Sequence, residues 1–197
     1  LIYLIHSMLP TTSLTQGSFS DFDLYLADNF ARAAQKNGVK NIIYLSGLIP
    51  QDGSELSEHL ASRLEVEKVL SQYGANLISL RASLIVGKNG SSFRILEKLV
   101  RRLPLFIFPA WTQSKPQPID LQDVLATLQY AVERADELSG PFDIGGPDIL
   151  TYQEMIMKTA KVLNKKRFYM NFPFFTPGLS KLWVSKITGT PHDLVYP

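Results

Sequence analysis

The stretch NIIYLSGL (residues 41–48) is a nearly continuous run of apolar residues that includes two neighbouring isoleucines. Runs of the same kind lie on either side of it, LIYLI at residues 1–5 and LISLRASLIV at residues 77–86. Continuous apolar strands are typical of a parallel sheet that is covered on both faces, whereas strands with one exposed face alternate apolar and polar residues. The three runs therefore predict buried strands of a parallel sheet.

Segments with apolar residues at helical spacing lie between these runs. Residues 21–37 and 57–73 separate the three strands, and each is followed or ended by a glycine that favours a helix stop. Thr151 and Glu154 have the spacing of a capping box at the start of a later helix. The alternation as a whole comprises further strands at 105–108 and 142–144 and helices at 92–102, 121–135 and 151–163. This order predicts a three-layer α/β fold, with helices on both faces of a mostly parallel sheet.

Composition excludes several classes of protein and of site. The chain has no cysteine, so disulfides, thiolate metal sites and cysteine nucleophiles are excluded, and a reducing, cytoplasmic location is expected. The formal net charge of +2 is too small to indicate a nucleic-acid-binding protein. No apolar run reaches the roughly 18 residues of a membrane span. His6, His59 and His192 are far apart in sequence, so no metal site is predicted.

Ligands of open parallel sheets bind at the carboxyl ends of the strands. Small and polar residues follow or end each predicted central strand, and these are the candidate ligand-binding residues: His6, Ser7 and Met8 at the first strand, Ser46 and Gly47 at the second, and Arg81, Ala82 and Ser83 within the third. The alternative is that they are simply turn residues at strand ends. Their common position at one edge of the sheet favours a ligand site.

The order of these motifs resembles that of a known protein family. NIIYLSGL, then HLASRLEVEKVL, then LISLRASLIVG resembles an extended or atypical short-chain dehydrogenase/reductase, and the later segments QPIDLQDV and GPFDIGGPDILTYQEM continue the likeness. The subgroup it resembles is that of the nucleoside-diphosphate-sugar epimerase-like proteins. The resemblance implies a Rossmann-like domain over residues 1–165 and NAD or NADP as the cofactor. Residues 166–197, rich in aromatics and prolines, are expected to be a small C-terminal cap over the substrate cleft, the alternative being a membrane-surface or partner-binding helix.

The active-site helix of this family carries Tyr-x-x-x-Lys, with a glutamate four residues after the lysine. Here His59 falls on the tyrosine, Arg63 on the lysine and Glu67 on the glutamate, while Arg81 falls on an arginine of the following strand. The resemblance implies catalytic roles for Ser46, His59 and Arg63, and cofactor contacts for Arg63 and the strand-end residues. The charge of Arg63 would favour neutral imidazole at His59. An alternative from spacing alone is an i, i+4 ladder on a solvated helix face.

The phosphate-binding glycine motif of the family, Gly-x-x-Gly-x-x-Gly, does not occur in this sequence. The run that begins at Leu1 corresponds to the fourth strand of the family's sheet, and it starts with no polar lead-in. We therefore expect that the N-terminal strands have been removed, that the cofactor binds only when they are present, and that the first strand has an exposed, unstable edge.

The expected function is that of an NAD(P)-binding oxidoreductase or epimerase-like protein acting on a small molecule, with a homodimer as a possible assembly. The alternative is a non-catalytic dinucleotide-sensing regulator or assembly factor that keeps the fold without the catalytic tyrosine. Fold alone does not separate the two.

Overall fold

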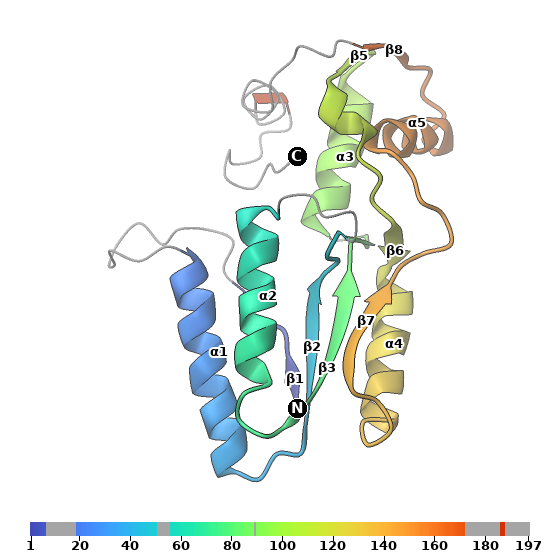
Figure 1. Cartoon of the computed structure of the whole chain (residues 1–197). Coiled ribbons are helices and arrows are strands. Elements are labelled where there is room, and N and C mark those ends of the chain that lie inside the picture. The colour runs from blue at the N-terminus through green and yellow to red at the C-terminus, as the bar shows by residue number, and fades with distance from the viewer. Residues whose placement is uncertain (7–18, 51–55, 89, 172–185, 188–197) are drawn as a thin grey trace. The chain divides into compact units, whose positions relative to one another are not determined.

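The computed structural model describes residues 1–6, 19–50, 56–88, 90–171 and 186–187 (Figure 1). The chain forms two compact units. Unit 1 comprises Leu1–Ser83 and Gln122–Gly145, and unit 2 comprises Leu84–Leu121 and Gly146–Pro197. The fold is α/β, as the strand and helix order predicts.

Unit 1 is built on a parallel sheet. Its four strands, in the order β1-β2-β3-β7, are β1 (Ile2–Tyr3), β2 (Asn41–Gly47), β3 (Asn76–Ala82) and β7 (Gly140–Ile144). The register pairs Tyr3 with Tyr44 and Tyr44 with Ser79, and it pairs Ser46 with Arg81. Because paired residues of a parallel ladder share a face, all five side chains lie on the same face of the sheet.

Helices lie on both faces of this sheet. On one face are α1 (Phe19–Lys36) and α2 (Glu58–Leu70), and Figure 1 shows α4 (Leu121–Glu133) on the other. Ala27 and Ala31 of α1 are fully buried against Tyr3 and Tyr44, where their small side chains let the helix approach the strands closely. The three-layer arrangement predicted from the alternation of strands and helices is confirmed.

The first strand differs from the prediction. Residues 1–5 were expected to be buried on both faces, but β1 has only two residues, and of the five only Tyr3 is buried. The other four apolar residues are 44–58% exposed; they are Leu1, Ile2, Leu4 and Ile5. The reason is topological: among the described residues β1 pairs only with β2, so it is an edge strand with an open side.

Within the described residues, unit 2 contains two small parallel sheets and two α-helices. The strands are β4 (Leu84–Val86) paired with β6 (Pro118–Asp120), and β5 (Leu105–Phe108) paired with β8 (Phe168–Asn171). The helices are α3 (Ser91–Arg102) and α5 (Tyr152–Val162), with a short 3₁₀ helix, η1 (Ala110–Gln113). Phe106 and Phe108 of β5 form a core with Val100 of α3 and Ile156 of α5.

Two sequence predictions are corrected in this part of the chain. The predicted strand 77–86 is interrupted at Ser83, and its last three residues form β4 in the other unit. Residues 168–171, expected to be irregular, form β8, because they find a partner in β5 across a long separation in sequence. Most of the expected cap at 166–197 lies outside the described residues, and its role over a cleft stays a prediction. In the part of the chain that the structure describes, no helix is long and apolar enough to cross a membrane.

The capping box predicted at Thr151 is confirmed. The backbone N–H of Glu154 donates to Thr151 Oγ1 at 3.1 Å, and the N–H of Thr151 donates to the Glu154 carboxylate at 2.7 Å. Thr151 is 8% exposed, so these contacts satisfy backbone donors that water reaches poorly.

Thr151→Ala should therefore lower the free energy of unfolding of unit 2 by about 1 kcal/mol, because the N-cap oxygen is lost, whereas Thr151→Ser should retain it. Urea unfolding followed by the fluorescence of Trp111, which packs against Tyr152 of α5, measures the effect in a Trp183→Phe background. Equal losses in the alanine and serine variants would contradict the capping role.

Candidate functional site

Polar residues gather at the carboxyl ends of β1 and β2 in unit 1. His6 follows β1, Ser46 and Gly47 end β2, and His59 and Arg63 belong to the first two turns of α2. Figure 1 shows that α2 begins at the end of the sheet toward which the strands point. The topology therefore brings five of the sequence-predicted site residues to the edge where ligands of parallel sheets bind.

The start of α2 is set by a local cap. The Oγ of Ser57 accepts from the backbone N–H of Leu60 at 3.4 Å. From there the 3.6-residue repeat places His59, Arg63 and Glu67 on one side of the helix. His59 and Arg63 are half-buried and Glu67 is 8% exposed, so this side packs toward the sheet. The alternative of a solvated ladder is wrong for Glu67.

Gly47 allows the close approach of α2 to the end of β2. A Cβ atom at this position would lie 2.7 Å from Leu60 Cδ2 and 3.4 Å from Arg63 Cδ. Any larger residue would push the Leu60 side chain away and crowd the stem of Arg63. The glycine thus holds the Arg63 side chain close to the end of the strand.

Charge at this edge centres on Arg63. Burial raises the pKa of the Tyr44 hydroxyl, and the neighbouring Arg63 guanidinium opposes that shift. Partial loss of solvation lowers the pKa of His6, Arg63 lowers it further, and Asp23 of α1 acts in the opposite direction. A hydrogen bond to the Leu4 backbone also opposes the shift. The neutral form of His6 therefore donates its one N–H to the Leu4 carbonyl and leaves the other ring nitrogen as an acceptor.

Buried hydroxyl groups lie beneath this edge. Among the described residues, the hydroxyls of Tyr3, Ser46 and Ser62 have no hydrogen-bond partner, although Ser46 lies near the Tyr44 hydroxyl. Ser46 is 4% exposed and Tyr3 is 1% exposed. Burial and, to a smaller extent, Asp23 raise the pKa of Tyr3 to about 12. Unsatisfied buried hydroxyls cost free energy, so their retention at one edge is a feature that a bound ligand or water would relieve.

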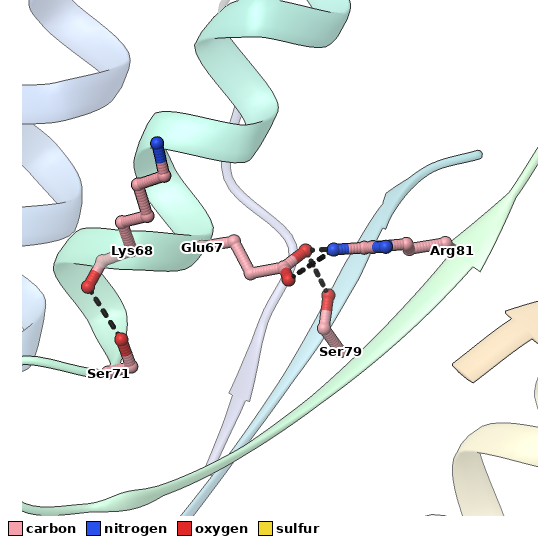
Figure 2. Close-up of polar contacts among 5 residues, drawn as sticks. All are labelled: Glu67, Lys68, Ser71, Ser79 and Arg81. Carbon is pink, nitrogen blue, oxygen red and sulfur yellow. Dashed lines mark hydrogen bonds and ion pairs between the residues drawn. The ribbon is translucent and has the colours of Figure 1, made fainter. Parts of the chain in front are cut away.

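Arg81, predicted to contact the cofactor, is bound by Glu67 (Figure 2). Arg81 donates through Nη2 to Glu67 Oε1 at 2.6 Å and through Nε to Oε2 at 3.1 Å, and Ser79 Oγ donates to Oε2 at 2.8 Å. The two charged side chains are 17% and 11% exposed. This bidentate pair joins the middle of α2 to β3, and it engages Arg81 donors that a cofactor would need.

The remaining predicted residues are placed as follows. Ala82 is buried at the end of β3, and its carbonyl accepts from the N–H of Leu48 at 2.9 Å. Ser83 is half-buried in the bend between β3 and β4. Ser7 and Met8 lie outside the described residues. No group of three or more metal-ligating side chains occurs in the described ranges.

Sequence reasoning missed Tyr3, Tyr44 and Asp23. The two tyrosines stand in apolar strands, where they read as core residues, and Asp23 reads as an acidic residue in the first turn of a helix. Asp23 is only 5% exposed, and no local pattern signals burial of a carboxylate. The register that pairs Tyr3 with Tyr44 brings the phenol rings within 5.7 Å of each other.

Unit 1 has a surface hollow at the opposite end of the sheet. It has a volume of about 400 Å³, and its lining includes Glu67, Lys68, Ser71, Asn76 and Gly140. Figure 2 shows two of these lining residues, Lys68 and Ser71, near the C-terminal end of α2. Because it adjoins the amino ends of β3 and β7, it is separate from the edge at which His6 and Arg63 lie.

Comparisons with known proteins identify a shared fold. No family model matches the chain, and no curated protein matches it in sequence. Among solved structures, UDP-N-acetylglucosamine 4-epimerase from Bacillus cereus is 20% identical with a TM-score of 0.64, over 84% of this chain and 64% of the epimerase. The enzyme WbmG from Bordetella bronchiseptica, in complex with NAD, is 15% identical with a TM-score of 0.68, over 87% of this chain and 58% of WbmG.

RMD from Pseudomonas aeruginosa, complexed with NADPH, is 14% identical with a TM-score of 0.66, over 95% of this chain and 74% of RMD. The chain spans less than two thirds of the length of the epimerase and of WbmG. At these identities the likeness is one of fold. The chain thus has the Rossmann-like α/β fold of these proteins.

Removal of one partner from the buried ion pair should be costly. Arg81→Met should lower the free energy of unfolding by about 3–5 kcal/mol, because it leaves the Glu67 carboxylate buried without its cation. The double variant Glu67→Met/Arg81→Met should recover much of this loss. Urea unfolding of unit 1, followed by circular dichroism, measures both.

The matched control for this cycle is the exposed pair of Arg134 and Glu137, whose side chains are 50% and 63% exposed. Arg134→Met should change the free energy of unfolding by less than about 1 kcal/mol. A loss at Arg81→Met as small as that of the control would refute the strong buried pair.

Tyr3→Phe should stabilise unit 1 by about 1 kcal/mol near neutral pH, because it removes a buried hydroxyl that has no partner. The pH dependence has a definite sign. Folding raises the pKa of Tyr3 from about 10 to about 12, so the folded state favours the neutral phenol. That contribution is fully present below pH 10 and is lost as the pH rises toward 12.

Tyr3→Phe should accordingly reduce the alkaline loss of stability, measured by urea unfolding at several pH values between 8 and 12. Tyr25→Phe is the control, because Tyr25 is 66% exposed on α1. This substitution should change neither the stability at neutral pH nor the loss of stability at alkaline pH. Destabilisation by Tyr3→Phe at neutral pH would show that the hydroxyl has a partner.

Proposed function

We propose that this chain is part of an NAD(P)-binding oxidoreductase or epimerase-like protein of the short-chain dehydrogenase/reductase superfamily, acting on a small molecule. The observation that carries the proposal is the convergence of His6, Gly47 and Arg63 at the carboxyl ends of parallel strands. Dinucleotides bind at this edge in doubly wound sheets. WbmG and RMD, which share the fold, hold NAD and NADPH, and this supports the same class of cofactor.

The described residues fit the nicotinamide-ribose part of such a cofactor. Arg63 offers cationic donors, Gly47 leaves no side chain between strand and helix, and the Ser46 hydroxyl has no partner in the described chain. We assign Arg63 to the ribose or phosphate oxygens. A bound NAD(P) would supply hydride transfer. The sequence has no Gly-x-x-Gly-x-x-Gly, so the described residues account for the nicotinamide-ribose part of the cofactor and not for its pyrophosphate.

In this proposal, different residues of the chain bind the ligand and transfer the proton. His59 is the proton donor or acceptor for the substrate, because imidazole titrates near neutral pH. His6 stays neutral, and its free ring nitrogen accepts a hydrogen bond from a substrate hydroxyl. Ser46 is too deeply buried to react directly in this geometry, so it acts by orienting the groups above it. The substrate itself is a small molecule of undefined class.

A second candidate, the non-catalytic dinucleotide sensor, is favoured by one observation. Helix α2 carries His59 and Arg63 at the positions where the resembled family has tyrosine and lysine. A guanidinium binds oxygen atoms well but does not titrate near neutral pH, so this pair retains binding chemistry and changes proton chemistry. Dinucleotide binding is common to both candidates, and turnover separates them.

The test is a fluorescence titration of the purified full-length protein with NADH and with NADPH. Arg63→Ala should raise the dissociation constant about tenfold or more, because it removes charge-assisted hydrogen bonds. Lys68→Ala is the matched control, since it removes an exposed cation on the far side of the same helix, and it should change binding less than about twofold. Melting temperatures of both variants check that unit 1 remains folded.

Turnover is then measured over a panel of nucleotide sugars and small carbonyl compounds. Net oxidation or reduction is followed by reduced-nicotinamide absorbance, and epimerisation, which leaves the amount of reduced nicotinamide unchanged, is followed by NMR of the sugar. Turnover that His59→Ala reduces at least tenfold supports the enzyme. Binding without turnover, unchanged by His59→Ala, supports the sensor. Failure of the wild-type protein to bind either dinucleotide overturns both candidates, and equal weakening by Arg63→Ala and Lys68→Ala overturns the placement of the site.

A further inference from the structure

The sheet formed by β5 and β8 in unit 2 has an exposed apolar face. Leu105 pairs with Phe168, and Ile107 pairs with Met170. Paired residues of a parallel ladder point to the same side, so these four side chains form one surface, the β5–β8 face. Their exposed fractions are 47%, 72%, 37% and 53% in that order. Contiguous exposure of large apolar side chains marks an interaction site or a liability to aggregate.

On the opposite face of the same sheet, the side chains of β5 are well packed, whereas Tyr169 of β8 is 50% exposed. Phe106 and Phe108, which alternate with the exposed residues of β5, are 2% and 3% exposed, and their rings stack 5.6 Å apart. They form a core with Val100 of α3 and Ile156 of α5. The core therefore holds β5, and β8 is held through its pairing with β5, so the β5–β8 face is the outer side of this sheet.

Basic residues lie at one end of the β5–β8 face. Arg101 and Arg102 end α3, two residues before β5, and Lys165, Lys166 and Arg167 immediately precede β8. Because the two strands are parallel and in register, both groups lie at the same end of the sheet. We call these five residues the basic end.

Hydrogen bonds of Arg167 hold the two halves of the basic end together. Its Nε donates to the carbonyl of Val100 at 2.7 Å, and its Nη2 donates to the carbonyl of Arg101 at 3.3 Å. Arg101 also pairs with Glu97 at 2.9 Å. Lys165 and Lys166 are exposed and form no ion pair with the described residues. The basic end thus keeps a surplus of positive charge facing solvent.

The surplus extends through the whole unit. Unit 2 contains 13 lysines and arginines and 5 aspartates and glutamates, whereas unit 1 contains 7 and 13. The net charge of +2 for the chain conceals this division. A partner that meets the β5–β8 face will be selected for negative charge as well as for an apolar surface.

We propose that the β5–β8 face docks on an anionic lipid membrane surface. The side chains of Leu105, Ile107, Phe168 and Met170 enter the boundary between headgroups and acyl chains, and the basic end lies against anionic headgroups. A second copy of this chain is a poor occupant, because two β5–β8 faces would also bring together two units that are each strongly positive. The proposal rests on unit 2 alone and is independent of dinucleotide binding.

The test is co-flotation of the purified protein with lipid vesicles. Vesicles of phosphatidylcholine alone should bind little protein, and vesicles in which about a third of the lipid is phosphatidylglycerol should bind at least about tenfold more. Raising the salt concentration to about 0.5 M should weaken this binding, because it screens the charge on the basic end. The vesicles of phosphatidylcholine alone serve as the baseline.

Paired variants separate the two contributions. Phe168→Ser/Met170→Ser removes apolar contact, and Lys165→Glu/Lys166→Glu reverses charge, and each should weaken binding to the anionic vesicles at least about tenfold. Val162→Ser and Lys36→Glu/Lys40→Glu are the controls. Val162 is 81% exposed on α5 outside the β5–β8 face, and Lys36 and Lys40 are exposed in unit 1. The controls should change binding less than about twofold.

Several results would overturn the proposal. These are no binding of the wild-type protein to either kind of vesicle, equal binding to both, or binding that the controls weaken as much as the paired variants. Light scattering that shows a dimer broken by Phe168→Ser/Met170→Ser would assign the face to a second copy instead. Melting temperatures and NADPH titration of each variant verify its fold, so failure of membrane binding is distinguishable from failure of the proposed dinucleotide site.

Discussion

The ion pair between Glu67 and Arg81 is the constraint on which the candidate site in unit 1 depends. Two charges that are mostly removed from water stabilise a fold only if their geometry is close to ideal, because desolvation opposes their attraction. The bidentate contact, completed by Ser79, meets that condition and leaves one arrangement of α2 on β3. Arg63, one helical turn before Glu67 and about 6 Å along the axis, is thereby positioned at the end of β2.

Around this pair, unit 1 keeps an unusual number of polar groups on the inner face of its sheet. Tyr3, Tyr44 and Ser46 lie on that face with Ser79 and Arg81, under helices α1 and α2. Purely apolar residues would pack there at lower cost. The two ends of this face differ in whether their polar groups have hydrogen-bond partners. Near Glu67 the polar groups satisfy one another, and near Ser46 and Tyr3 hydroxyls remain without partners among the described residues.

Unit 2 differs from unit 1 in where its polar and apolar side chains lie. Its core is apolar, formed by residues such as Val100 and Phe106, while its outer sheet face is also apolar and is bordered by cations. The division of charge between the units matters for association, because a field of one sign acts over about a Debye length, roughly 8–10 Å. Each unit therefore presents a different partner preference, although the chain as a whole is close to neutral.

The sequence by itself determined the helices and the longer strands and their order, because helical periodicity, caps and continuous apolar strands are local signals. It did not predict the short strands β6 and β8. It placed α2 and α5 within a few residues of their ends, including the Thr151 cap, and it put His59, Arg63 and Glu67 on one side of a helix. Tertiary structure alone decided that Arg81 binds Glu67, that β1 is an edge strand, and that residues 168–171 pair with β5. These features depend on contacts between residues far apart in the chain, whose burial and register no local pattern encodes.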